Sequence, residues 1–366
     1  MERFLGMHFL DHLFFAGSFG VSQFAYRKYH GARDAVLYVL LIWLLAYAHG
    51  RKVATCCSDV VSAFDRVSFE KLMAKIRKSV IHEDLVRVIE DWLIGRKGQV
   101  IIEGVSSESF DLENMTFQGT VWGPALWNLF FSDAPLAMRK CAFKEVVFAD
   151  DLNAYREFAN GTPTEFVLGQ LHRCQDELHQ WGLANSVTFN PKKESFHILS
   201  HTESFGPSFK LLGVTLDVQL TMAEATHEFS VEAHWRLSSL LRSRRFFITR
   251  DVVLHYKSQV LSFLEYRTCA ITHAADVHLH AVDTVQRRFL RNLNLSPYDT
   301  CHSFNLAPLS TRRDVANLGI IYRAVIRRGP KQLLELFKLD LVMRRSSPRR
   351  DLRHLQVVDS VGDLSP

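Results

Sequence analysis

Apolar residues recur at intervals of three and four over much of the chain, which is the spacing of amphipathic helices. The longest runs predict three helical stretches: 67–92, 164–184 and 228–300. Shorter segments rich in Val, Ile and Phe predict strands: 99–105, 145–155 and 196–199. The second of these is interrupted by a tight turn, so it predicts two strands joined as a hairpin. We assign the predicted helix at 67–92 to core packing and give it no chemistry.

One long apolar run, Ala35–Ala48, requires a choice between a buried helix and a membrane anchor. A helix over this run would be about 21 Å long, short of the roughly 30 Å hydrocarbon core of a bilayer. We therefore expect a buried helix and no membrane partner, with a membrane-anchored protein as the alternative. The preceding segment, Met1–Ser22, carries Glu2, Arg3 and Asp11 among its apolar residues, so it does not form the apolar centre of a signal peptide.

The composition is that of an ordinary globular chain. Of the 366 residues, 47% are hydrophobic and 23% charged, and the formal net charge is +5. Arginines gather late in the chain, an asymmetry that suits a polyanionic partner but also occurs in proteins that never bind nucleic acid. The six cysteines show no Cys-x-x-Cys spacing, which argues against a zinc knuckle or a disulfide framework. We expect a reducing, intracellular compartment, either nucleus or cytoplasm.

Two adjacent acids, Asp150 and Asp151, lie at the turn of the hairpin predicted over 145–155. Two like charges repel strongly once water is excluded, so a hard cation such as Mg²⁺ would allow both to stay ionised. A solvated Asp-Asp turn is the simpler alternative. A further acid, Asp59, ends a short strand-like run that contains Val53, just before a helical pattern begins. Asp59 could therefore supply another carboxylate to the same metal site.

Between these acids lies 117–133, a loop with glycines and a proline that leads into an apolar, aromatic helix. In this order of motifs the chain resembles the reverse transcriptases of non-LTR retrotransposons, the jockey-like and LINE-type mobile elements. Three segments carry the resemblance: Asp59…Ala63-Phe64-Asp65, Gln118-Gly119…Gly123-Pro124…Asn128-Leu129-Phe130 and Phe148-Ala149-Asp150-Asp151. Gln23-Phe24-Ala25-Tyr26-Arg27 is similar to a further segment of that family, which precedes the helix joining fingers to palm.

The resemblance implies an α+β fold of the right-hand polymerase type, with an antiparallel palm sheet backed by helices. It divides the chain into a fingers remnant with connecting helix, a palm, a primer-grip hairpin, a helical thumb and a post-thumb helical segment: 1–50, 51–200, 201–227, 228–300 and 301–343. The composition of 344–366 predicts a basic, disordered tail. Met1–Phe4 aligns just after the family's basic finger segment, so we expect truncated fingers and no preceding endonuclease domain.

The implied activity is RNA-directed DNA synthesis from an RNA template, a DNA primer and deoxynucleoside triphosphates. Asp59, Asp150 and Asp151 would be catalytic metal ligands for two Mg²⁺ ions, with Mn²⁺ as a possible substitute. Lys193, in a loop before the strand at 196–199, would approach the leaving pyrophosphate as a further catalytic residue. A lysine in such a loop is otherwise simply solvated.

The resemblance also implies which residues bind the incoming nucleotide. Gln118, Gly119, Gly123 and Pro124 would lie beneath the nascent base pair, with the Gln118 side chain at the sugar. Phe64 would be the sugar gate, since a ring under the 2′ position excludes a ribose hydroxyl. The alternatives are an ordinary helix N-terminus for the loop and a core position for Phe64.

Nucleic-acid contacts are expected mainly from the basic, aromatic-rich helices of 228–300. The expected contact residues are Arg27, Gly213 in the primer-grip hairpin, and Arg244, Arg245, Arg287 and Arg288 of the thumb. A solvated charged face is the alternative for the thumb arginines. The rival function is a decayed element fragment that binds primer–template but polymerises feebly or not at all. The sequence does not indicate an oligomeric state.

Overall fold

A four-stranded antiparallel sheet forms the centre of the first 200 residues in the computed structural model. The structure describes residues 1–113, 116–336, 339–341 and 353–355. The sheet has the strand order β6-β7-β1-β8: Lys144–Phe148, Asp151–Ala159, Arg51–Ser58 and Ser195–Leu199. Each neighbouring pair is antiparallel, and β1 pairs with both β7 and β8. The predicted hairpin over 145–155 and the predicted strand at 196–199 are thereby confirmed.

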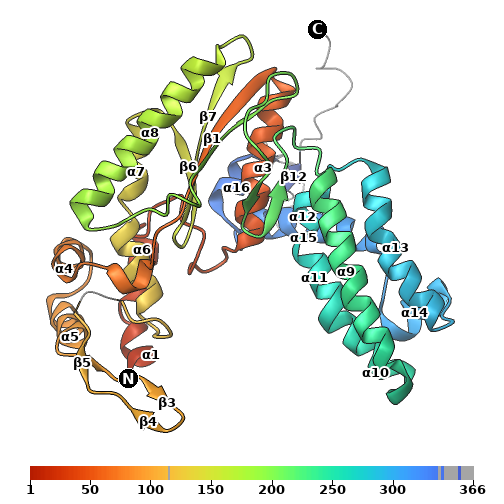
Figure 1. The fold of residues 1–366 in the computed structure, drawn as a ribbon, viewed down its shortest axis with the longest axis horizontal. Coiled ribbons are helices and arrows are strands. Elements are labelled where there is room, and N and C mark those ends of the chain that lie inside the picture. The colour runs from red at the N-terminus through yellow and green to blue at the C-terminus, as the bar shows by residue number, and fades with distance from the viewer. Residues whose placement is uncertain (114–115, 337–338, 342–352, 356–366) are drawn as a thin grey trace, which may run out of the picture.

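Helices cover both faces of the sheet. Successive residues of a strand face opposite sides, and Val53 and Ala54 of β1 belong to two different core clusters. The cluster of Ala54 includes residues of α8 (Thr164–Asn185), and that of Val53 includes residues of α3 (Ala32–Ala48). Figure 1 shows these helices on either side of the strands. The helix predicted at 164–184 and the buried helix predicted at 35–48 are confirmed.

Membrane crossing was the alternative for the apolar run. Among the described residues, none of the helices combines the length and the apolar content that crossing a bilayer requires. Within α3, residues such as Val39, Leu40 and Trp43 are almost completely buried against the rest of the protein. The apolar run is therefore accounted for by packing inside the fold.

The segment 67–92 forms two helices rather than the single one predicted. They are α4 (Phe69–Arg77) and α5 (Glu83–Leu93). Ser79 donates its hydroxyl to the Ile76 carbonyl oxygen, and the His82 side chain accepts the Asp84 N–H and caps α5. Such local side-chain bonds offer the backbone an alternative to a continuous helix. The apolar spacing continues across the break because both helices bury their apolar residues in the same core cluster.

The segment 99–105 is also different from its prediction as one strand. It contains a tight hairpin of β3 (Ile101–Ile102) and β4 (Val105–Ser106), with Glu103 and Gly104 in the turn. Both turn residues have positive φ, as in a type I′ turn. A further pair, β2 (Lys97–Gly98) with β5 (Phe110–Asp111), extends the same projection.

The remaining elements that precede β6 in the chain are short. They comprise α1 (Glu2–Gly6), α2 (Leu10–Phe15), the 3₁₀ helix η1 (Ala63–Arg66), α6 (Gly123–Phe131) and α7 (Ala134–Arg139). The hairpin predicted over 209–217 consists of β9 (Phe209–Leu211) and β10 (Val214–Leu216). Its two turn residues, Leu212 and Gly213, have φ values of 48° and 80°, and glycine adopts such a conformation readily.

Helices dominate after residue 222, as the spacing predicts. They are α9 (Ala223–Ser243), η2 (Arg244–Phe246), α10 (Thr249–Tyr256), the π-helical turn η3 (Lys257–Leu261), α11 (Ser262–Tyr266), α12 (Thr268–Ile271), α13 (Asp276–Asn292), α14 (Pro297–Phe304), α15 (Leu309–Val325) and α16 (Lys331–Leu336). The core cluster on the α3 face of the sheet continues into α9, α10 and α13. The predicted palm and thumb segments therefore share a core.

The predicted tail, 344–366, lies mostly outside the described residues. Within it the structure describes Arg353–Leu355, which form strand β12 against β11 (Leu339–Leu341).

Candidate active site

The sheet brings Asp59 beside the β6–β7 turn although about ninety residues separate them in the sequence. In the β1–β7 pairing, Ser58 lies opposite Leu152, so the next position sets Asp59 against Asp151. Phe148 pairs with Asp151, which leaves Ala149 and Asp150 as the two-residue turn. The antiparallel register thus gathers the three predicted acids at one end of the sheet.

These carboxyls influence one another. The pKa of Asp151 is raised to about 6, by burial first and then by the charge of Asp150 and contact with Asp59. Burial, followed by the charge of Asp59, also raises the pKa of Asp150. Raised carboxyl pKa values mean that negative charge is held here with too little compensation from solvent and cations. Such a group of acids is a candidate functional site on physical grounds.

Lys193 supplies the positive charge that lies nearest to Asp59. Its Nζ is 2.8 Å from Asp59 Oδ2, and this contact is the main reason why the pKa of Lys193 is raised. The backbone holds the Lys193 loop in place, because Asn190 N donates to the Asp59 carbonyl oxygen and Lys193 N donates to that of Asn190. The Lys193 side chain itself is 61% exposed, so it can move without disturbing the core.

The three acids suit a hard divalent cation by their chemistry. Carboxylate oxygens are the ligands that Mg²⁺ prefers, and two of these carboxyls are partly buried, which is the main reason why their pKa values are raised. As the side chains stand, however, the described part of the chain contains no group of three or more His, Cys, Asp or Glu arranged to hold a metal ion. Asp59 directs an oxygen to Lys193 instead.

Glu194 supports the same loop and was not predicted. Its side chain is 6% exposed, and Oε1 accepts the Ser58 hydroxyl at 3.2 Å and lies 2.8 Å from His179 Nε2. Because Ser58 precedes Asp59 and Glu194 follows Lys193, this contact joins the two segments that form the ion pair. Nothing in the local sequence distinguishes Glu194 from a solvated loop acid.

The predicted nucleotide loop lies against η1. Gln118 is exposed, with its Nε2 at 3.4 and 3.5 Å from the Asp65 carboxylate oxygens. Gly119 is also exposed, and Pro124 stands in the first turn of α6, where a missing N–H costs nothing. At Gly123 a Cβ would lie 2.5 Å from the Thr116 carbonyl oxygen, so no larger residue fits there.

Phe64 is half-buried between two aromatic rings. Its ring centroid is 5.9 Å from that of Trp127 on α6 and 6.4 Å from that of Tyr26, which it meets edge-on. Its carbonyl oxygen accepts the Thr116 N–H over 2.8 Å, which ties η1 to the Gln118 loop.

Tyr26 is a second residue that the sequence did not indicate. It is 53% exposed, and its pKa is raised by burial and then by the charge of Asp150, so the phenol lies within electrostatic range of that acid. Its φ of 55° turns the chain sharply after the Gln23 segment. That backbone conformation has no marker in the sequence, since tyrosine seldom adopts it.

Arg27, which was predicted to contact nucleic acid, makes several contacts within its own segment. Its Nη1 donates to the backbone carbonyl oxygens of Gly20 and Gln23, over 2.9 and 2.8 Å. The guanidinium also lies over the Phe14 ring, and burial lowers its pKa. These contacts describe an arginine that holds its own segment together.

The primer-grip turn and the thumb arginines are tied to the helices. Arg267 Nε donates to the Gly213 carbonyl oxygen over 3.3 Å. Arg244 Nη1 donates to the backbone and side-chain oxygens of Asn292, so the ends of α9 and α13 lie together. The three remaining predicted arginines make weaker or ring contacts: Arg245 over Phe246, Arg287 to the His280 carbonyl oxygen and Arg288 to His234.

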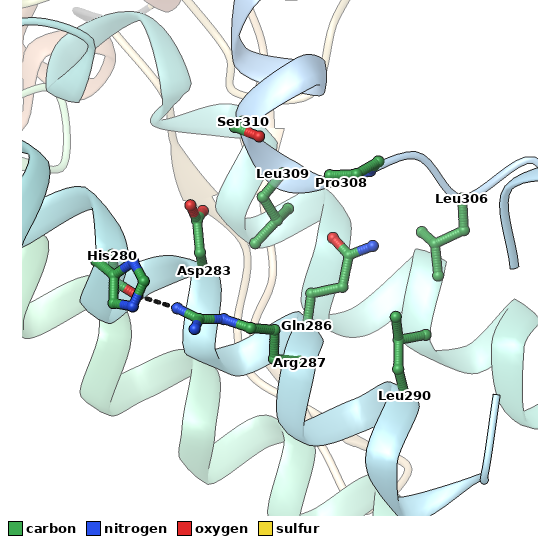
Figure 2. Close-up of a pocket in the computed structure, with 9 residues that line it drawn as sticks. All are labelled: His280, Asp283, Gln286, Arg287, Leu290, Leu306, Pro308, Leu309 and Ser310. Carbon is green, nitrogen blue, oxygen red and sulfur yellow. Dashed lines mark hydrogen bonds between the residues drawn. The ribbon is translucent and has the colours of Figure 1, made fainter. Parts of the chain in front are cut away.

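A pocket of about 240 Å³ adjoins Arg287, between α13 and the start of α15. Figure 2 shows Arg287 and His280 at one side of it, Leu290 and Leu306 at the other, and Leu309 between them. The acids at the sheet end do not contribute to its lining.

A family profile described as "Reverse transcriptase (RNA-dependent DNA polymerase)" matches residues 8–216. The RNA-directed DNA polymerase from mobile element jockey of Drosophila funebris is 27% identical over 299 residues, covering 75% of this chain and 32% of that protein. The probable RNA-directed DNA polymerase from transposon X-element of Drosophila melanogaster is 23% identical over 305 residues, covering 79% and 34%.

The chain thus spans about a third of the length of the curated relatives it matches. Among solved structures, telomerase from Candida albicans in complex with a fragment of telomeric RNA covers 82% of this chain and 55% of its own. Its TM-score is 0.46 and its sequence identity 12%.

Proposed function

The chain belongs to the reverse transcriptase (RNA-dependent DNA polymerase) family, and from this premise we propose that it extends a DNA primer on an RNA template. The relatives that it matches are named as polymerases of mobile elements, so we assign this chain to the polymerase part of such an element. Its substrates are deoxynucleoside triphosphates.

The observation that carries this proposal is the convergence of Asp59, Asp150 and Asp151 at one end of the sheet. The pKa values of Asp150 and Asp151 are raised, and the charge of Asp59 contributes to the rise in both. Two divalent ions held by the three acids, Mg²⁺ or Mn²⁺, would supply Lewis-acid stabilisation of the attacking and leaving oxygens. The acids also hold that end of the sheet negative, which favours cations over other ligands.

Lys193 has a second role in this scheme. Its ammonium neutralises Asp59 in the structure, and its exposed, raised-pKa side chain stays charged at neutral pH. Once another positive charge satisfies Asp59, the Lys193 Nζ is released to face the leaving pyrophosphate. There it neutralises developing charge or donates a proton.

Around the acids, Phe64 and Gln118 select and orient the nucleotide. The Phe64 ring is only half-buried and lies on Trp127, so a fixed aromatic edge remains available to exclude a 2′-hydroxyl. Gln118 is exposed and bonded only weakly to Asp65, which leaves its amide available to a sugar hydroxyl. The thumb arginines would hold the duplex by its phosphates.

Primer extension on an RNA template with Mg²⁺ tests the proposal, with chelator as the matched control. We expect metal-dependent extension by the chain of residues 1–366. Binding of primer–template without extension, at any Mg²⁺ or Mn²⁺ concentration, would instead support the alternative of a fragment that binds nucleic acid and does not polymerise.

A further inference from the structure

We propose that Gln23 is a positioning residue for the acidic turn, because its side chain fixes the peptide unit that leads into Asp150. Gln23 is 3% exposed. Its Nε2 donates to the Ala149 carbonyl oxygen over 3.1 Å, and its Oε1 accepts the Ala149 N–H over 2.9 Å. Oε1 also accepts the Ala25 N–H over 3.0 Å. The consequence for catalysis rests on the proposed function, whereas the positioning itself does not.

Ala149 needs such support because of its backbone conformation. Its φ is 59°, in the left-handed region that residues with a Cβ seldom adopt. A second donor, Trp127 Nε1, reaches the same carbonyl oxygen over 3.0 Å. Ala149 is also 7% exposed, so solvent contributes little to its hydrogen bonding. Both polar groups of this residue are therefore held by side chains.

Backbone pairing brings Gln23 to this place. Val147 N donates to the Ser22 carbonyl oxygen and Phe24 N donates to that of Val147, which sets the segment parallel to β6. Because β6 is an edge strand of the sheet, its outer side is free to accept this segment. Asn128 Nδ2 then fixes the Ala25 carbonyl oxygen over 2.9 Å. Gln23 thus lies beside Val147, two residues before Ala149, and its side chain reaches from there to the turn.

Glutamine is suited to this position by its chemistry. A primary amide presents a donor and an acceptor on one planar group, so it can bond an N–H and a carbonyl oxygen of the same residue. Methionine has similar length and neither function. An ionised glutamate keeps the acceptor and loses the donor. These two substitutions therefore separate the contributions of the two bonds.

Hydrogen exchange at the Ala149 amide tests the positioning directly, without any need for activity. In Gln23→Met the Ala149 N–H loses its acceptor, so we expect its exchange to accelerate at least about tenfold. The Val147 amide, bonded to the Ser22 carbonyl oxygen, should change much less. Gln286→Met is the matched control, since Gln286 is 5% exposed and donates to Ala307 in the thumb. Unchanged exchange at Ala149 in Gln23→Met would overturn the proposal.

Two further variants keep the test decisive if Gln23→Met does not fold. Gln23→Glu retains the acceptor and should leave the Ala149 amide protected while weakening the bond to its carbonyl oxygen. Trp127→Phe removes only the indole donor and should give a smaller effect at Ala149 than loss of both Gln23 bonds. A double variant of the two leaves the Ala149 carbonyl oxygen without either donor, so exchange at the Ala149 amide should be faster than in either single variant. Exchange in the double variant as slow as in the unaltered chain would overturn the proposal.

Kinetics then distinguish positioning from general stability. A misplaced acid should lower kcat while nucleotide binding is largely kept, so Gln23→Met should lose about tenfold or more in kcat with KM within about threefold. Gln286→Met should keep both constants. Unchanged kcat in Gln23→Met would overturn the catalytic consequence. If the unaltered chain does not extend primers, the proposed function fails, and exchange at Ala149 still decides the positioning.

Discussion

The sheet end carries negative charge and the thumb helices carry positive charge, and the two regions differ in how their charged side chains are buried and paired. At the sheet end, acids are partly buried and close together, and Lys193 is the cation that acts on all three. In the thumb, arginines such as Arg244 and Arg287 are exposed and bond to neutral oxygens. At the sheet end the negative charge of the acids is only partly compensated by Lys193. In the thumb the arginines are solvated by water. This difference favours our proposal of a cation site at the sheet end and of phosphate contacts along the thumb.

The largest effect is expected from removing charge at the sheet end. Asp150→Asn should reduce extension by about 10²–10³-fold or more, because one lost ligand weakens transition-state stabilisation. Asp91→Asn, an exposed change on α5, is the matched control in the primer-extension assay. Extension by Asp150→Asn at the level of the control would contradict the assignment of the acids.

The affinity of the thumb for primer–template should depend more on salt concentration than on any single arginine. Replacing Arg244, Arg245, Arg287 and Arg288 together by Ala should lower the slope of log affinity against log salt by about 1 for each lost phosphate contact. Binding titrations of primer–template at several salt concentrations measure this, with Arg87→Ala on α5 as control. An unchanged slope would mean that these arginines form only a solvated face.

Phe64 is uncharged, and its ring contacts Trp127 and Tyr26, the two aromatic residues next to the acidic turn. If the ring is a steric gate, Phe64→Ala should raise ribonucleotide over deoxyribonucleotide incorporation by about tenfold, an energy of roughly 1.4 kcal/mol. Phe166→Ala, at a 54% exposed position of α8, is the control for loss of a ring. A loss of stability with no change in sugar preference would identify Phe64 as a core residue.

The smallest expected effect is a pH dependence that the palm segment owes to His197. Burial lowers the pKa of this histidine to about 4, against an ordinary 6.5. The unfolded chain therefore takes up the proton first, so the stability contributed by neutral His197 is present above pH 6.5 and lost as pH falls towards 4.

Thermal unfolding between pH 7 and 4 measures this contribution. We expect His197→Phe to flatten the fall in melting temperature by roughly 2–5 °C. The ring of this histidine already stacks on Phe209, with centroids 4.1 Å apart, so phenylalanine should pack there. His227→Phe, at an exposed position of α9, should leave the pH dependence unchanged.

The sequence was informative wherever a local pattern decides a local structure. The apolar spacing gave α8 almost to the residue, and the run of strand formers around Asp150 and Asp151 gave the hairpin. Where short-range side-chain bonds override the spacing, as at Ser79 and His82, one predicted helix became two. The Glu103-Gly104 turn likewise divided one predicted strand into a hairpin.

The parts of the site that the sequence missed depend on contacts between distant segments. Gln23 and Ala149 are 126 positions apart, and the Lys193–Asp59 ion pair spans 134. No periodicity connects such positions. The backbone partners of Arg27 are likewise visible only in the fold, and its contact with nucleic acid stays a prediction. The roles of the predicted site residues stay predictions until the experiments above are done.

The central position of β1 has a consequence for how the chain folds during synthesis. Its partners are β7 and β8, so its hydrogen bonds cannot be completed until residue 199 has emerged from the ribosome. At typical elongation rates of about 5–20 residues per second, β1 waits on the order of 10 s for its neighbours. Pairings so distant in sequence also slow folding itself. Apolar residues of β1 therefore wait longer for their partners than those of α9 that pack on α13, because α9 and α13 lie within about seventy residues of each other.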